Sequence, residues 1–189
     1  MFLVFVSLVN RYKSALDNEK MKARIDFKTG IYNSQYFYEL AAVEAAVEIE
    51  RSRRYKHTFA VAFIDCDNFK TVNDTFGHQL GDKLLFLIAD TIKNNIRMSD
   101  ICARLGGDEF IILFPETDQE LSLRKIKELQ NVLLETIRNK KYLVTFSIGI
   151  VTFVEIPQNV DEMIKQADEM MYAAKKSGKD MIKCEVYKE

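Results

Sequence analysis

Apolar residues recur at helical spacing in five segments of the chain, so each is predicted to form a helix with one buried face. The stripe is clearest where Leu129, Leu133 and Ile137 follow one another. The spacing slips in the first segment, which therefore does not predict a regular coiled coil. The predicted helices span residues 8–25, 34–54, 82–95, 118–139 and 160–174.

Shorter apolar runs between these helices predict strands. Residues 58–64 are almost continuously apolar, as in a central strand buried on both faces, and the run ends in Asp65-Cys66-Asp67. Two further runs flank Gly106-Gly107, which predicts a tight hairpin because glycine tolerates the positive φ of such turns. The remaining predictions are hairpin strands at 101–105 and 110–114, a strand region at 142–154 interrupted by Ser147-Ile148-Gly149, an edge strand at 181–187, a loop at 26–33 and a turn-rich segment with a short helical turn at 68–82.

Length and composition place these elements in one globular domain. The chain has 189 residues, 48% of them hydrophobic, and a net charge of −1. Together with the element order this predicts an α/β (α+β) fold, in which helices flank a mixed sheet of about five strands. The near-neutral charge argues against nucleic acid as a partner. Three widely spaced cysteines without a CxxC pair indicate a reducing, cytoplasmic compartment and no zinc site.

The first residues form a separate apolar segment. Phe2 to Val9 is too short to span a bilayer, and it lacks the basic start of a signal peptide. Arg11 and Lys13 follow it, as they would just inside a membrane. Two interpretations stay open. The segment is either the end of a transmembrane helix, at the inner face of a membrane, or a helix that pairs with its own copy or packs on the domain.

Carboxylates gather at the predicted strand ends. Asp65 and Asp67 end the most buried strand, and Asp108 and Glu109 lie at the hairpin turn. If the hairpin lies beside that strand, these like charges repel one another unless a cation lies between them. Mg²⁺ or Mn²⁺ suits oxygen ligands, and such a cluster fits two-metal phosphoryl or nucleotidyl transfer. The alternative is that these acids only cap strands at the surface.

The polar segment that follows favours a nucleotide. Lys70 offers a point charge for phosphate. Asn73 and Asp82 can pair with a purine edge, and a carboxylate accepts well from the N1–H and 2-amino group of guanine. His78 is more simply a structural hydrogen-bonding residue, and Asn73 is also a common turn former.

Together these residues resemble the GGDEF domain of bacterial diguanylate cyclases. The resemblance is carried by Ile64-Asp65-Cys66-Asp67-Asn68-Phe69-Lys70-Thr71-Val72-Asn73-Asp74-Thr75-Phe76-Gly77-His78-Gln79-Leu80-Gly81-Asp82 and by Arg104-Leu105-Gly106-Gly107-Asp108-Glu109-Phe110. It extends to segments 26–30, 147–150 and 174–179. It implies a palm-like fold related to nucleotidyl cyclases, with residues 1–25 as an N-terminal linker helix and 26–189 as the catalytic domain.

The resemblance also implies an activity, which is the condensation of two GTP molecules to cyclic di-GMP with release of pyrophosphate. Each domain would bind one GTP, so an antiparallel homodimer must join two half-sites, each with two Mg²⁺ or Mn²⁺ ions. The implied catalytic residues are Asp65, Asp108, Glu109 and Lys70; the metal ligands are Asp65, Asp108 and the carbonyl of Cys66; and the substrate-binding residues are Phe69, Lys70, Asn73, Asp82, Gly107, Lys175 and Lys179.

Arg97-Met98-Ser99-Asp100 stands at the family's spacing for an inhibitory product site, and Arg104 could add to it. Arginine suits this role because its fork binds phosphate and guanine acceptors at two points. A surface ion pair is the alternative.

The chain departs from the family pattern in four places. Lys28 replaces a leucine, Ser34 and Gln35 replace basic residues, Cys66 replaces an aliphatic residue, and Lys179-Asp180 replaces Arg-Asn. The first two touch no catalytic role, and of Cys66 only the backbone would matter. The last puts the phosphate contact at that end in question.

Three functions remain to be separated. The first is an active diguanylate cyclase, which the intact acids favour. The second is a catalytically silent GGDEF domain that binds GTP or cyclic di-GMP. The third is a cyclase that makes a mixed GMP–AMP product, against which Asp82 argues because relaxed guanine selection would require its loss.

Overall fold

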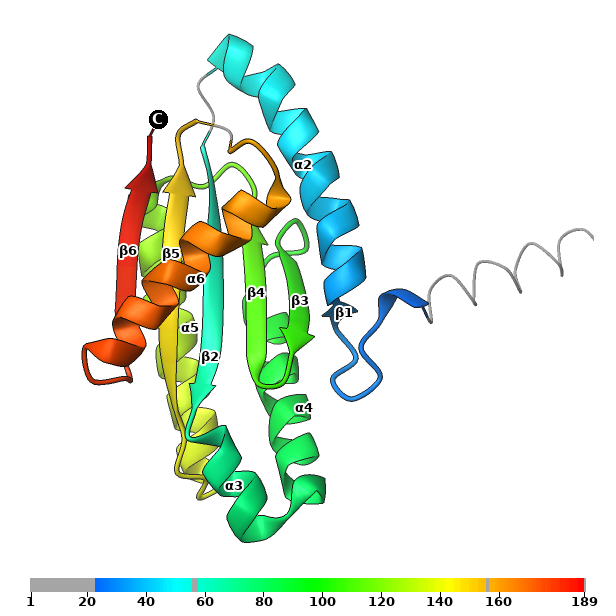
Figure 1. The fold of residues 1–189 in the computed structure, drawn as a ribbon, viewed down its shortest axis with the longest axis vertical. Helices are drawn as coiled ribbons and strands as arrows, with labels where there is room; N and C mark the ends of the chain where they lie inside the picture. Colours follow the sequence, from blue (N-terminus) through cyan, green and yellow to red (C-terminus); the bar gives the residue numbers. More distant parts are fainter. Residues whose placement is uncertain (1–22, 56–57, 156, 189) are drawn as a thin grey trace, which may run out of the picture.

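The computed structural model describes residues 23–55, 58–155 and 157–188, and these form a six-stranded mixed sheet with helices on both faces (Figure 1). The strand order is β1-β3-β4-β2-β5-β6, with β1–β3 and β5–β6 parallel and the other pairs antiparallel. The elements are β1 (Tyr32–Asn33), α2 (Ser34–Tyr55), β2 (Phe59–Asp67), α3 (Phe69–Phe76), α4 (His78–Asn95), β3 (Ile101–Gly106), β4 (Glu109–Phe114), α5 (Gln119–Asn139), β5 (Thr145–Phe153), α6 (Val160–Lys176) and β6 (Ile182–Tyr187).

The sheet separates two hydrophobic cores. One face carries Ala60, Ala62 and Ile64 of β2 against apolar residues of α3, α4 and α5. The other face carries Phe59 and Phe63 against α2 and α6, which cross in front of the sheet in Figure 1. Since β2 is buried at every position, the sequence was right to predict a central strand with both faces covered.

The hydrophobic stripes of α5 and α6 predicted their positions well, and polar caps fix where they begin. The side chain of Asp118 accepts from the Leu121 amide at 2.8 Å, and that of Asn159 accepts from the Glu162 amide at 2.8 Å. Each cap satisfies an amide that has no partner inside its helix. The mixed α/β prediction is confirmed, with β1 as a short extra strand inside the predicted loop.

The predicted interruption of the strand at residues 147–149 is wrong, because β5 runs without a break from Thr145 to Phe153. A Cβ at Gly149 would collide with the backbone of Met171 and Ala167 in α6. This glycine is therefore present to let the helix approach the strand, and it does not mark a bend.

The turn-rich segment at 68–82 is more helical than predicted. Residues 69–76 form α3, and α4 begins at His78 rather than at Asp82. Asn68 lies in the left-handed region at φ 65°, so it turns the chain sharply from β2 into α3.

The predicted helix at 8–25 falls mostly outside the described residues, as does the apolar segment at 2–9. Among the described residues, no helix combines the length and apolar character needed to cross a bilayer.

Candidate active site

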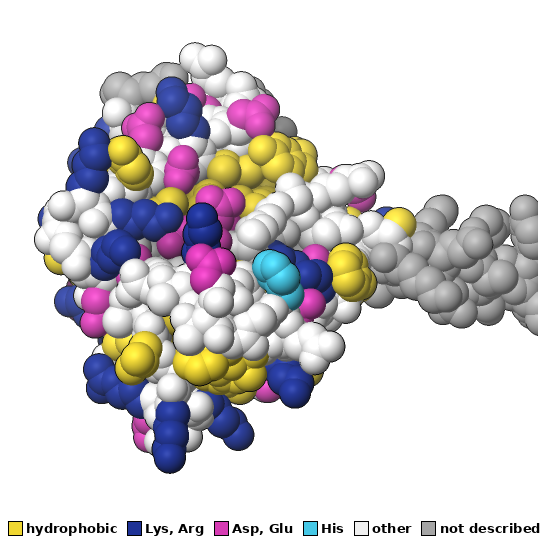
Figure 2. Space-filling view, turned by 60° about the horizontal axis from the view of Figure 1, so that its bottom comes forward, with side chains coloured by type: hydrophobic (Ala, Val, Ile, Leu, Met, Phe, Trp, Pro, Cys, Tyr) yellow, Lys and Arg dark blue, Asp and Glu magenta, His cyan; other side chains and the backbone are white. Residues whose placement is uncertain are grey.

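The end of β2 meets the hairpin turn at one edge of the sheet. Asp65 pairs with Glu109 in the antiparallel ladder between β2 and β4. The Cys66 amide donates to the Asp108 carbonyl at 3.3 Å, which ties the turn to the strand. Gly107 has a φ of 51° in this turn. The predicted convergence of the strand-end and hairpin acids is therefore present. Figure 2 looks onto this end of the molecule, where acidic and basic side chains gather together.

Burial raises the pKa of each carboxyl group in this cluster, and the charge of a neighbouring acid adds to the effect. For Asp65, with 4% of its surface exposed, burial is the largest cause, and Lys175 opposes it. Burial followed by the charge of Asp65 raises the pKa of Asp108 and of Glu109. A site that raises the pKa of three neighbouring acids favours any cation that enters it.

The cation at the cluster is Lys175, near the end of α6. Its Nζ lies 2.6 Å from Oδ2 of Asp65. Burial lowers the pKa of this ammonium, but the hydrogen bond and charge of Asp65 and the charges of Asp108 and Glu109 outweigh it, so the net pKa is raised. The sequence placed Lys175 at the triphosphate, and the structure places it at the acids themselves.

The donor set of this cluster fits a hard divalent cation. Asp65 and Asp108 offer carboxylate oxygens, the ligands that Mg²⁺ and Mn²⁺ prefer. Burial raises the pKa of both groups, so a cation that binds the charged carboxylates would offset the cost of that burial. Within the described part of the chain, no three His, Cys, Asp or Glu side chains are yet arranged around a common point as a metal would require.

Asp67, grouped with the other acids from the sequence, has different neighbours. Its carboxylate accepts from Thr145 Oγ1 at 2.8 Å, from Ser147 Oγ at 2.8 Å and from the amide of Asp180 at 3.2 Å. It is 2% exposed. Asp67 thus joins β2, β5 and the loop after α6.

That loop carries Lys179, the predicted phosphate contact. Lys179 and Asp180 both have positive φ, 65° and 48°. The ammonium of Lys179 donates to Oδ1 of Asn68 at 2.9 Å. The lysine that replaces the family's arginine is therefore held at the same edge of the sheet as Asp65.

The residues predicted to hold guanine lie where α3 meets α4. A Cβ at Gly81 would collide with the side-chain oxygen of Asn73, and it would lie 3.2 Å from Cζ of Phe69. The side chain of Asn73 is therefore packed against the residue that precedes Asp82. Gly81 is a site residue that sequence reasoning missed; a glycine directly before the candidate guanine acid was the available signal.

Three other residues of this region have different surroundings. Lys70 and His78 are both exposed, on α3 and at the start of α4. Lys28, to which the sequence assigned no role, binds Asp82: its Nζ lies 2.7 Å from Oδ1.

Comparison with known proteins decides the family. The model for "Diguanylate cyclase, GGDEF domain" matches residues 23–181. The chain belongs to the GGDEF domain family. It is 32% identical over 176 residues to the diguanylate cyclase DgcP of Pseudomonas aeruginosa, and 34% identical over 174 residues to the probable diguanylate cyclase DgcT of Escherichia coli. These alignments cover 90% and 89% of this chain but 25% and 37% of the relatives.

A solved structure shows the same fold. The coiled coil and GGDEF domain of DgcB from Caulobacter crescentus, in complex with c-di-GMP, has a TM-score of 0.83 with this chain. The two share 21% identity over 97% of each chain, so the likeness shows the fold alone. It supports the palm-like, GGDEF-type architecture that the sequence implied.

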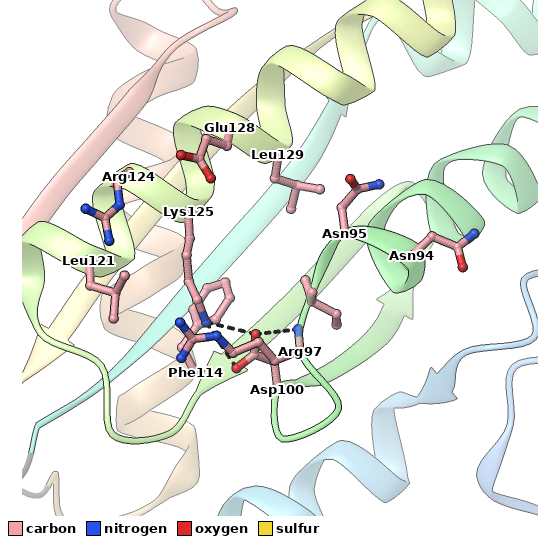
Figure 3. Close-up of a pocket in the computed structure, with 11 residues that line it drawn as sticks. Asn94, Asn95, Arg97, Asp100, Phe114, Leu121, Arg124, Lys125, Glu128 and Leu129 are labelled. Carbon is pink, nitrogen blue, oxygen red and sulfur yellow. Dashed lines mark hydrogen bonds and ion pairs between the residues drawn. The ribbon is translucent and has the colours of Figure 1, made fainter.

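Arg97 and Asp100 of this GGDEF domain line a cavity of about 390 Å³ between α4 and α5 (Figure 3). The Asp100 carboxylate accepts from the Arg97 amide at 2.9 Å and binds Lys125 Nζ at 2.9 Å. Arg124, Lys125 and Glu128 also line this cavity, so it contains three basic and two acidic side chains. Asp100 is 8% exposed, so it shapes the cavity wall rather than forming a surface ion pair.

Arg104 lies elsewhere in the GGDEF domain. Its guanidinium donates to the Gly107 carbonyl at 2.7 Å and binds Asp26 at 3.0 Å. It lines neither cavity that contains Arg97. Three residue steps along β3, from Ile101 to Arg104, add roughly 10 Å at about 3.3 Å a residue between the Arg97–Asp100 loop and Arg104. Arg104 therefore braces the GGDEF turn.

Sequence reasoning also missed Asp168. Burial raises its pKa, with Lys175 opposing, and its charge contributes to the raised pKa of Glu109. Asp168 precedes Lys175 by two helical turns on α6, so both lie on the same face. That spacing was the signal that could have found it.

Proposed function

We propose that this chain is an active diguanylate cyclase that condenses two GTP molecules into cyclic di-GMP. The observation that carries the proposal is the cluster of three buried or half-buried acids, Asp65, Asp108 and Glu109, whose pKa values are raised by burial first and by neighbouring acids second. A stable fold gains nothing from such a cluster, whereas a site for cations and phosphates uses it.

The reaction joins two nucleotides in two equivalent steps. The 3′-oxygen of one GTP attacks the α-phosphorus of the other, a new P–O bond forms, and the bond to the β-phosphate breaks and releases pyrophosphate. Asp65, Asp108 and the carbonyl of Cys66 would hold Mg²⁺ or Mn²⁺, two per half-site. When bound, these ions neutralise phosphate charge and lower the pKa of the attacking hydroxyl.

The chain's own residues orient the nucleotide and move its proton. Asn73 and Asp82 would bind guanine, with Phe69 beside them. Lys70, Lys175, Lys179 and the backbone at Gly107 would surround the phosphates. Glu109, whose pKa is raised by burial and by Asp65 and Asp108, would accept the proton of the 3′-hydroxyl.

The active species would be a homodimer. One chain offers one Asn73–Asp82 pair and one acid cluster, so it holds one GTP. Two chains in antiparallel arrangement bring the reacting groups together. Residues 1–25 would set this arrangement, as a membrane-attached segment at the cytoplasmic face or as a free pairing helix.

A second function, a catalytically silent domain that binds GTP or cyclic di-GMP, is favoured by the position of Lys175. The ammonium of Lys175 lies 2.6 Å from Oδ2 of Asp65, a carboxylate that would bind the metal ion. In an active enzyme Lys175 must move toward phosphate when the metal binds.

Incubation of the purified chain with GTP, ATP and Mg²⁺, followed by chromatography, separates these functions. We expect cyclic di-GMP and pyrophosphate, with no mixed product. Asp108→Asn should lower the rate by about 10³-fold, as loss of a charge that stabilises the transition state does. A chain that binds GTP but forms no cyclic dinucleotide would leave the silent domain as the better description.

Product inhibition through the Arg97 cavity is the second part of the proposal. Arg97 and Arg124 would contact the phosphates of cyclic di-GMP, while Asp100 and Lys125 hold the loop in place. Arg97→Ala should raise the inhibition constant for cyclic di-GMP by about tenfold or more, because a bidentate contact to charge is lost. The rate without product should not change. Arg138→Ala, an exposed residue near the end of α5, is the matched control. An unchanged inhibition constant in Arg97→Ala would contradict product inhibition through the Arg97 cavity.

A further inference from the structure

The ion pair between Lys28 and Asp82 joins two segments that are distant in sequence. Nζ of Lys28 lies 2.7 Å from Oδ1 of Asp82, and the side chains are 33% and 45% exposed. Lys28 stands where the family has a leucine, which could not make this contact. The pair therefore adds a positive charge at a position that is apolar in the family pattern.

The loop that carries Lys28 is built to hold its position. The Asp26 carboxylate accepts from the Thr29 amide at 3.0 Å and from the Thr29 hydroxyl at 2.6 Å. Arg104 binds the same carboxylate at 3.0 Å, and Thr29 is 3% exposed. These contacts lower the pKa of Asp26 against the opposing effect of burial, as in a satisfied ion pair. Lys28 thus extends from a fixed loop toward α4.

The surroundings of Asp82 leave room for a ligand beside Lys28. Lys28 engages Oδ1, and a carboxylate with two oxygens has about four acceptor positions. Asp82 is almost half exposed. A bound base can therefore use the remaining acceptor positions without displacing the lysine.

The chemistry of guanine matches this arrangement. Its N1–H and 2-amino group donate to a carboxylate, and O6, the acceptor next to N1–H, then needs a donor. An ammonium has three protons, of which Asp82 takes one. Adenine and 2,6-diaminopurine carry an amino group in place of O6, which an ammonium would oppose.

We propose that Lys28 is a guanine-selecting residue, whose ammonium donates to O6 while Asp82 binds the N1–H and 2-amino group of the same base. This inference rests on the proposed GTP site. It gives the chain a cationic contact to the base that the family's leucine does not supply.

Binding of three base analogues tests this contact without turnover. The probes are the α,β-methylene triphosphates of guanosine, inosine and 2,6-diaminopurine riboside, measured by calorimetry with Mg²⁺. Guanosine and inosine carry O6, whereas 2,6-diaminopurine does not. Lys28→Met should weaken the first two about three- to tenfold, because a partly exposed charge-assisted hydrogen bond is lost. It should not weaken the third, because the ammonium makes no favourable contact with a 6-amino group.

Two further variants separate this role from a structural one. Lys28→Arg should keep the preference for O6, because a guanidinium also donates. Lys83→Met removes an exposed lysine next to Asp82 and should change none of the three affinities. Tighter guanosine binding in Lys28→Met would show that Lys28 competes with guanine. Equal weakening of all three analogues would show that it only holds Asp82, and no change would show that it does not contact the base. Each of these results overturns the proposal.

The outcome for Lys28 is distinguishable from that for the cyclase. A chain that shows the O6 preference but makes no cyclic di-GMP contradicts the proposed activity and keeps this inference. If the chain makes cyclic di-GMP but Lys28→Met leaves all three affinities unchanged, the proposed activity stands and the role of Lys28 is contradicted. If the unaltered chain does not bind the guanosine analogue, both are overturned.

Discussion

Asp65 and Asp67 lie two residues apart on the same face of β2, and both are buried, at 4% and 2% exposure. Asp67 accepts three hydrogen bonds from neutral donors of β5 and the loop after α6. Asp65 lies opposite Glu109 in the ladder and near Asp108 of the turn, and it has one ammonium as its partner. One carboxylate is satisfied by its own fold and the other is not.

Under the proposed function, this difference separates an acid that serves structure, Asp67, from one that serves chemistry, Asp65. Neutral donors around Asp67 fix the position of Lys179 and Asp180, so Asp67 is a positioning residue. Repulsion around Asp65 stores free energy that a cation or phosphate-bound metal would release. Sequence position alone ranks the two acids equally, since both follow the same apolar run.

The largest expected effect is the loss of activity in Asp65→Ala. The cyclase rate should fall by about 10³-fold, because a charge that holds the reacting phosphates is removed. The free energy of unfolding should change by less than about 1 kcal/mol, since relief of repulsion offsets the lost Lys175 contact. Urea denaturation and a rate assay on the same sample measure both. A large loss of stability would mean that Asp65 serves structure as Asp67 does.

Asp67→Ala should show the opposite balance. Three donors, of which Ser147 is buried, lose their acceptor, so the free energy of unfolding should fall by about 3 kcal/mol. Thr145→Val, which removes one of these donors, is the matched control and should cost about 1 kcal/mol. Activity should fall through a higher KM for GTP, because Lys179 is displaced, more than through kcat. If unfolding by urea is unchanged in Asp67→Ala, the structural role assigned to this residue is incorrect.

The smallest expected effect is on the pH dependence of stability. In the folded chain the pKa of Asp108 is raised above its usual 3.8, first by burial and then by Asp65. Between the unfolded and folded values the folded state binds more protons, so stability falls as pH rises through that window. Asp108→Asn removes this dependence.

The test compares the unfolding free energy of Asp108→Asn and of the unaltered chain from pH 4 to pH 7. The advantage of the variant should grow with pH. A constant difference across this range would contradict the repulsion in the cluster. Asp26, whose pKa is lowered, has the opposite sign: its contribution is present above 3.8 and is lost as the pH falls through its folded value.

The sequence predicted the elements whose patterns are strong and local. The stripe of α5 and the unbroken apolar run of β2 follow from periodicity, and the Gly106-Gly107 turn follows from backbone freedom. The errors came where distant packing decides. Gly149 signalled a break in the strand, but it is there because α6 lies against β5. His78, rather than Asp82, begins α4.

In the candidate site, too, the sequence predicted some residues and distant packing decided the contacts of others. Asp65, Asp108 and Glu109 could be grouped from the sequence, because a strand end and a hairpin turn that follow buried strands meet at one edge. Lys175 could be named from the family pattern, but its contact with Asp65 depends on the angle at which α6 crosses the sheet. No local pattern encodes that angle.

By itself, the sequence determined the family, the fold class and the acids, because these depend on residue type and short-range spacing. The tertiary structure decided which partner each charge receives. Asp67 accepts hydrogen bonds from neutral donors, and Asp65 binds Lys175. Asp82 binds Lys28, and Arg104 binds the turn at Gly107. The physical reason is that a hydrogen bond or ion pair needs its two groups within a few ångströms, and those distances are set by segments far apart in the chain.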